Sequence, residues 1–69
     1  DITGLTRQEL IDRYGDPAYT ATKSGGEIWT YEVAPMWKYG AKGKLKVFLE
    51  ENVVTESTFV PVQDKGASL

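Results

Sequence analysis

The residues from Thr6 to Pro17 specify both ends of one short helix, and this limits how much of the fold can be helical. Thr6 is a good N-cap, and Glu9 stands three residues later, where its carboxylate can reach back to the N–H of the cap. Gly15 suits the residue after the helix, because glycine adopts positive φ without steric strain. Pro17 prevents the helix from continuing. After Pro17 the pattern changes from helical spacing to alternation.

Four stretches after Pro17 have the alternation or the β-branched composition of strands. They are 19–23, 27–33, 44–50 and 53–60. Ser24–Gly26 and Glu51–Asn52 read as turns, and Met36–Gly43 reads as a loop. Consecutive strands with short connections favour an antiparallel meander over a crossover connection.

The alternation predicts which side chains face the core. In two of the strands the inward positions are Trp29, Tyr31, Val33, Leu45, Val47 and Leu49, whereas Lys44, Lys46 and Phe48 point outward. In 53–60 the facing stays open, because Val53 and Phe59 share one parity and Val54 and Val60 share the other. The helix is expected to cover the inward face through Leu5, Leu10, Ile11 and Tyr14.

We therefore predict an α+β domain with one N-terminal helix packed on a three- to four-stranded antiparallel meander. The domain is expected over residues 1–62, with a disordered tail at 63–69. The 69 residues include no cysteine and no histidine, which excludes disulfides and the usual zinc sites. The fold must accordingly rest on its apolar core or on a partner.

The ends of the chain bear on where it acts. The sequence begins at Asp1 without a methionine, so we expect a processed or excised form with any signal peptide or lipid-attachment cysteine upstream. No apolar run approaches the roughly 20 residues that span a bilayer as a helix.

The loop after the second predicted strand has the composition of a contact surface. Residues 34–49 contain no acidic residue. The candidate partner-binding residues are Met36, Trp37, Lys38, Tyr39, Lys42, Lys44 and Lys46. Aromatic side chains supply contact area, and lysines attract an acidic protein or anionic lipid headgroups. The alternative is that Trp37 plugs the core and the lysines are merely solvated. No nucleic-acid partner is expected, because the chain has a net charge of −2 and four lysines make only a small footprint. A small domain that binds anionic lipid or nucleic acid is kept as a less favoured alternative.

Ile28 and Phe48 form a second candidate surface. Both fall on the outward face, where they are expected to lie near one another beside Tyr19 and Thr30. An exposed apolar pair of this kind is a docking patch, unless another helix or a second copy of the domain covers it.

The sequence offers little for catalysis. Gly40-x-x-Gly43-Lys44 lacks the spacing of a phosphate loop, and Leu45 stands where a Ser or Thr is required. The acidic residues Glu9, Asp12 and Asp16 are better explained by the helix cap and a solvated helix face. Glu50 and Glu51 at a hairpin tip suit at most weak calcium binding. We expect no enzyme activity, no cofactor and no metal.

Several of these motifs together resemble a known family. They are Gly4-Leu5-Thr6 with Leu10, Gly15 and Pro17, then Trp29-x-Tyr31, then Leu45-x-Val47-x-Leu49 with Val53. Over about residues 4–56 the chain looks like the SmpA/OmlA (BamE-like) family of small outer-membrane lipoproteins.

The resemblance implies a non-catalytic binding or scaffolding module of the bacterial envelope, at the periplasmic face of the outer membrane or in the periplasm. It further implies an accessory role in outer-membrane protein assembly. Family members have two helices on a three-stranded sheet and an acylated cysteine. Here one helix is visible, and the cysteine is missing. A similar fold also serves as a protein inhibitor of β-lactamase, so an inhibitor is the alternative function. Oligomeric state stays open.

Overall fold

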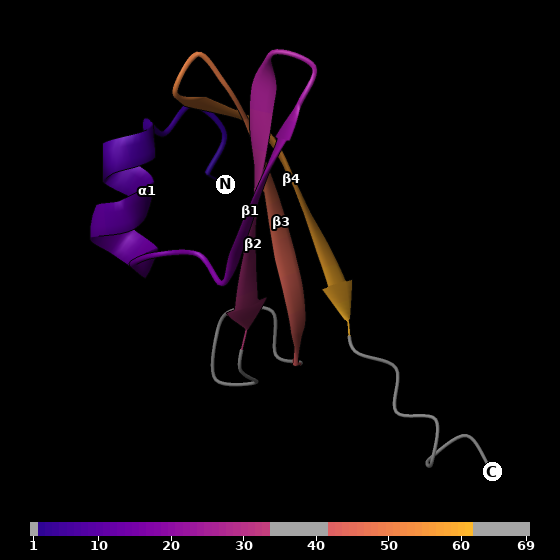
Figure 1. The fold of residues 1–69 in the computed structure, drawn as a ribbon. Coiled ribbons are helices and arrows are strands. Elements are labelled where there is room, and N and C mark those ends of the chain that lie inside the picture. The colour runs from indigo at the N-terminus through magenta and orange to yellow at the C-terminus, as the bar shows by residue number, and fades with distance from the viewer. Residues whose placement is uncertain (1, 34–41, 62–69) are drawn as a thin grey trace, which may run out of the picture.

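The computed structural model describes residues 2–33 and 42–61, which form one helix and one antiparallel sheet (Figure 1). The elements are α1 (Arg7–Tyr14), β1 (Tyr19–Lys23), β2 (Gly26–Val33), β3 (Gly43–Glu50) and β4 (Val53–Pro61). The four strands lie in the order β1-β2-β3-β4, so the predicted α+β meander is confirmed. The predicted tail and the loop residues Met36, Trp37, Lys38 and Tyr39 lie outside the described residues.

Both ends of α1 form as the sequence predicts. The Thr6 hydroxyl accepts a hydrogen bond from the Glu9 N–H at 3.2 Å, and the Thr6 N–H donates to the Glu9 carboxylate at 2.9 Å. At the other end Gly15 has a φ of +80°, and its N–H donates to the Ile11 carbonyl at 2.7 Å. This reciprocal capping box satisfies backbone donors that a short helix otherwise leaves unpaired.

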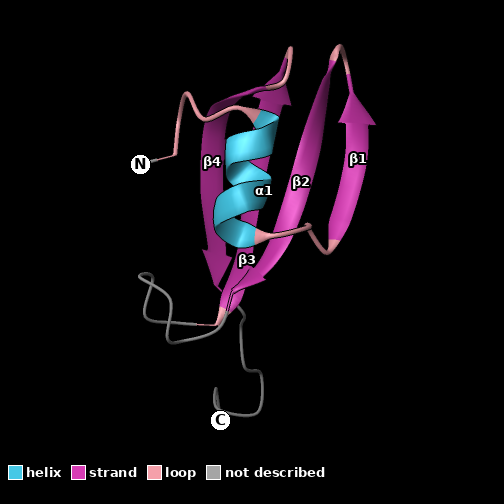
Figure 2. Cartoon of the chain, turned by 90° about the vertical axis from the view of Figure 1, so that its left-hand side faces the viewer, coloured by secondary structure: helices cyan, strands magenta, loops and turns pink. Residues whose placement is uncertain are grey.

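The helix packs on one face of the sheet (Figure 2). Leu10 is fully buried there, and Leu5, Ile11 and Tyr14 pack around it. All six predicted inward positions are buried: Trp29, Tyr31, Val33, Leu45, Val47 and Leu49. Ile2 and Val54 complete the buried cluster. The domain therefore has a one-sided core between α1 and the sheet.

Tyr31 ties the end of the helix to the sheet. Its hydroxyl donates to the Gly15 carbonyl at 2.9 Å, and its ring centroid lies 5.8 Å from that of Tyr14. Burial, together with nearby Asp16 and Tyr14, raises the pKa of Tyr31 to about 12. The neutral phenol is therefore the form that the fold stabilises.

A β-bulge resolves the facing of β4. Leu49 lies opposite Val54 and Phe48 lies opposite Glu56, so Thr55 is an extra residue in β4. Because of this extra residue, the even-numbered side chains of β4 face the helix before the bulge, and the odd-numbered side chains face the helix after it. Val54 and Phe59 consequently both lie on the helix side, although they are five positions apart in the sequence.

The turns that join β1 to β2 and β3 to β4 are each two residues long. Ser24 and Gly25 have φ values of 36° and 82°, and Glu51 and Asn52 have values of 51° and 68°. Two consecutive residues at positive φ match the right-handed twist of the flanking strands. Gly26, which we assigned to the turn, is instead the first residue of β2.

Gly43 is likewise part of β3 and not of the preceding loop, which corrects the sequence assignment. A Cβ at this position would lie 2.5 Å from the Val60 carbonyl oxygen and 2.6 Å from the Phe59 ring. Glycine is needed here because β4 approaches the backbone closely, so this glycine marks packing and not chain flexibility.

The N-terminal segment closes the fold by pairing with β4. The Gly4 N–H donates to the Val54 carbonyl, and the Val54 N–H donates to the Leu5 carbonyl, both at 2.8 Å. The Arg7 N–H donates to the Asn52 carbonyl, also at 2.8 Å. These bonds cover the first residues of the outer edge of β4.

We expect Thr6→Ala to lower the free energy of unfolding by about 1 kcal/mol, because the Glu9 N–H loses its acceptor. Thr6→Ser keeps a hydroxyl at the cap and is the matched control. Urea unfolding followed by circular dichroism measures both variants. Equal stability of Thr6→Ala and Thr6→Ser would show that the capping box contributes nothing.

Tyr31→Phe should lower the free energy of unfolding at pH 7 by about 1 kcal/mol through loss of the bond to Gly15. The pKa of Tyr31 is raised in the fold, so wild-type stability falls as pH rises above the ordinary tyrosine value of 10.0. Phenylalanine cannot ionise, so the gap between wild type and variant should narrow at pH 11. Urea unfolding at both pH values tests this, and a gap that stays constant contradicts it.

Candidate functional site

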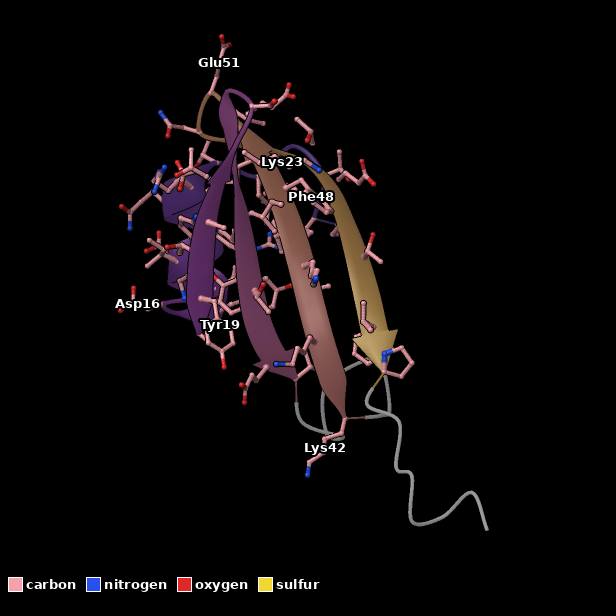
Figure 3. All side chains as sticks on the ribbon, turned by 45° about the vertical axis from the view of Figure 1, so that its right-hand side comes forward. Asp16, Tyr19, Lys23, Lys42, Phe48 and Glu51 are labelled. Carbon is pink, nitrogen blue, oxygen red and sulfur yellow. The ribbon has the colours of Figure 1, made fainter. Side chains whose placement is uncertain are left out.

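The face of the sheet opposite α1 is bare in the part of the chain that the structure describes (Figures 1 and 3). Its side chains follow from the strand register and include apolar, basic and acidic groups. They are Tyr19, Ala21, Lys23, Ile28, Thr30, Glu32, Lys44, Lys46, Phe48, Glu50, Val53, Glu56, Thr58 and Val60. We call this surface the open face.

Ile28 and Phe48, which we expected to lie near one another on the outward face, are directly opposite each other on the open face, two residues from the Gly26 and Glu50 ends of β2 and β3. Both are half-buried, with Ala21 beside Ile28 and Glu56 beside Phe48. They line an open hollow of about 340 Å³ together with Lys23 and Glu50. Figure 3 shows Lys23 and Phe48 toward the same end of the sheet. This part of the open face is therefore a shallow apolar depression with a polar rim.

The described lysines of the predicted contact loop lie on or beside this face. Lys46 is exposed opposite Thr30, and Lys42 is exposed just before β3. The Lys44 ammonium lies 5.2 Å from the centroid of the Tyr19 ring, which is 57% exposed. The fold thus brings part of the first candidate surface next to the second. The other predicted contact residues, Met36, Trp37, Lys38 and Tyr39, lie outside the described residues.

Charge is divided along the strands of the open face. Lys42, Lys44 and Lys46 lie at one end, and Glu50, Glu51 and Glu56 lie at or near the other. Figure 3 shows Lys42 and Glu51 at opposite ends of the sheet. A strand rises about 3.3 Å per residue, so Lys44 and Glu50 in β3 are about 20 Å apart. Glu32 lies opposite Lys44, and Lys23 lies at the same end of the sheet as Glu50, so this division of charge is partial.

A polar cluster on the helix side was missed at the sequence level. Glu27 pairs with the Arg7 guanidinium and accepts a hydrogen bond from the Trp29 indole N–H at 2.8 Å. Arg7 also donates to the Asn52 side chain at 3.0 Å and lies 5.1 Å from the Trp29 ring centroid. The sequence could have indicated this cluster. Glu27 is two positions before Trp29 in the same strand and so faces inward with it, which is unusual for a charged residue unless it is paired.

The Trp29 hydrogen bond lowers the pKa of Glu27, and the Arg7 charge lowers it further, while partial burial acts in the opposite direction. The carboxylate is therefore stabilised as an anion. The cluster joins the start of α1, β2 and the β3–β4 turn, and both carboxylate oxygens of Glu27 are used in these contacts. We regard it as structural.

The described residues offer neither a metal site nor a membrane-spanning helix. Among residues 2–33 and 42–61, no group of three or more acidic side chains is placed to hold a metal ion. Glu9 is engaged in the helix cap, and Asp12 accepts a hydrogen bond from the Gln8 side chain at 3.0 Å. In the same residues, no helix has the length and hydropathy to cross a bilayer.

Glu27→Gln should destabilise the fold at pH 7, because the variant has no negative charge for Arg7. The folded-state pKa of Glu27 lies below its ordinary value of 4.5, so this stabilisation is present above that pH and is lost as pH falls through the folded-state value. The difference in urea midpoint between wild type and variant should therefore shrink from pH 6 toward pH 2. A difference that is independent of pH would exclude the charge pair as its source.

Comparison of the chain with protein-family models, with curated proteins and with solved structures found no match in any of the three. The SmpA/OmlA resemblance therefore stays a prediction from the motifs quoted above.

Proposed function

We propose that this domain is a non-catalytic protein-binding module that contacts its partner through the open face. The observation that carries the proposal is the half-buried Ile28–Phe48 pair on a sheet face that no described segment covers. An apolar depression with a polar rim suits an apolar side chain of a partner, with the rim excluding water from the contact.

The distribution of charge favours a protein over a lipid surface or a nucleic acid. Lysines at one end of the open face would attract any polyanion, but Glu32, Glu50 and Glu56 on the same face would repel it. A protein partner can present groups of opposite charge to both ends of the open face. It would place an apolar side chain in the hollow beside Ile28 and Phe48, acidic groups near Lys44 and Lys46, and basic groups near the glutamates.

The family resemblance suggests where the domain acts and in which process. It favours a scaffolding role in the bacterial envelope, as an accessory to outer-membrane protein assembly. The inhibitor alternative differs in having one tight enzyme partner, and it would appear as stoichiometric inhibition of a hydrolase such as a β-lactamase.

Phe48→Ser separates a docking role from a core role. Phe48 is half-buried, so we expect the substitution to lower the free energy of unfolding by about 1 kcal/mol, well below the 2–5 kcal/mol typical of a truncated buried leucine. Leu45→Ala, at a position that is 1% exposed, supplies that comparison. A loss at Phe48 as large as that at Leu45 would make Phe48 core and defeat the proposal.

Binding is tested by amide NMR titration of labelled protein with bacterial envelope extract. We expect shifts at 28–30 and 44–48 that Phe48→Ser abolishes and that Arg13→Ala, on the exposed side of the helix, leaves intact. Anionic vesicles and single-stranded DNA are titrated in parallel. Shifts with either of these, falling steeply with salt, would favour a polyanion ligand instead.

A further inference from the structure

One edge of the sheet is open in the described structure. β1 is the outermost strand, and all five of its side chains are exposed. In Figure 2 no described segment lies beyond β1, and α1 lies over the other strands. The opposite edge is protected at several points, by the N-terminal segment, by the bulge at Thr55 and by Pro61. The β1 edge has no bulge or proline between Tyr19 and Lys23.

The hairpin geometry determines which backbone groups point outward from this edge. Lys23 and Gly26 flank a two-residue turn with positive φ at both positions, so they form a hydrogen-bonded pair. The pattern alternates, so Tyr19, Ala21 and Lys23 direct their backbone groups toward β2. The N–H and C=O groups of Thr20 and Thr22 then point away from the sheet.

We infer that β1 pairs antiparallel with β1 of a second copy of this chain, on a two-fold axis at Ala21. The two outward-pointing residues lie symmetrically on either side of Ala21. Thr20 of each copy therefore lies opposite Thr22 of the other copy, which gives two such pairs. Each of the two pairs supplies two backbone hydrogen bonds. Among the possible registers, the one centred on Ala21 pairs all five strand residues.

The side chains fit this register as well. Tyr19 comes opposite Lys23 of the second copy, which places an ammonium beside an aromatic ring that is more than half exposed. Thr20 comes opposite Thr22, and threonine pairs stabilise antiparallel strands. Ala21 faces Ala21, where small side chains allow close approach. No two like charges stand directly opposite each other in this arrangement.

The resulting assembly is a continuous eight-stranded sheet. A two-fold axis through paired edge strands runs perpendicular to the sheet, so both helices lie on one side and both open faces lie on the other. An edge contact of five residues is small, and interfaces below about 1,000 Å² correspond to weak, concentration-dependent association. A covalent trap is therefore the appropriate assay.

Ala21→Cys tests the inference directly, because the chain contains no other cysteine. Across the axis the two Cα atoms of a non-hydrogen-bonded pair lie about 4.5 Å apart, within the range that a disulfide spans. Thr58→Cys is the control, exposed on the same face but in β4. We expect mild oxidation to form the Ala21→Cys dimer at least about tenfold faster than the Thr58→Cys dimer. In the paired state only the thiol at position 21 lies next to the same thiol of the second copy.

Two second-site variants of Ala21→Cys complete the test, with folding checked by circular dichroism. Thr22→Pro removes an outward N–H, and Tyr19→Lys brings lysines opposite each other; either should slow dimer formation to the Thr58→Cys rate. If Thr22→Pro does not fold, Tyr19→Lys decides. Equal rates for Ala21→Cys and Thr58→Cys, or an unchanged rate in a folded Tyr19→Lys variant, would overturn the inference. Phe48→Ser should leave the rate unchanged, so this result is independent of partner binding at the open face.

Discussion

The packing of one short helix on one face of the sheet is the constraint on which the rest of this molecule depends. A chain of 69 residues without cysteine has no covalent cross-link within it to stabilise the fold, and a domain of this size buries only about 60% of its unfolded surface. The buried cluster therefore concentrates around Leu10 and two rows of strand residues. The single described helix lies on the opposite side of the sheet from Ile28 and Phe48, which explains why an apolar pair can remain half-buried at the surface.

The placement of α1 rests on polar contacts at both of its ends. At the N-terminal end Arg7 reaches β2 and the β3–β4 turn through Glu27 and Asn52. At the C-terminal end the Gly15 carbonyl accepts the Tyr31 hydroxyl. A helix of eight residues is marginal alone, so these contacts, together with burial of Leu10, hold its orientation. An exposed charged cluster can therefore be structural, which is why Arg7 and Glu27 are not assigned to the binding surface.

The features that could be predicted from the sequence are those that depend on residues close to one another in the chain. The capping box needs only Thr6 and Glu9, and the strand faces need only the alternation around Trp29 and Val47. The bulge at Thr55 was not predictable, because it depends on how β4 meets β3. The role of Gly43 depends on the Phe59 ring across the sheet. For the candidate site, the Ile28–Phe48 pairing followed from parity, whereas the approach of Lys44 to Tyr19 required the strand order β1-β2-β3.

The bonds that join the N-terminal segment to β4 have a consequence for the order of folding. The β1–β2 and β3–β4 hairpins close through two-residue turns, and isolated hairpins form in about 1–10 µs. Arg7 and Asn52, by contrast, are 45 residues apart in the chain, so their contact closes a much larger loop. We expect this closure to follow the transition state. The N-terminal segment would then govern how long the native state persists, while the hairpins govern how fast it is reached.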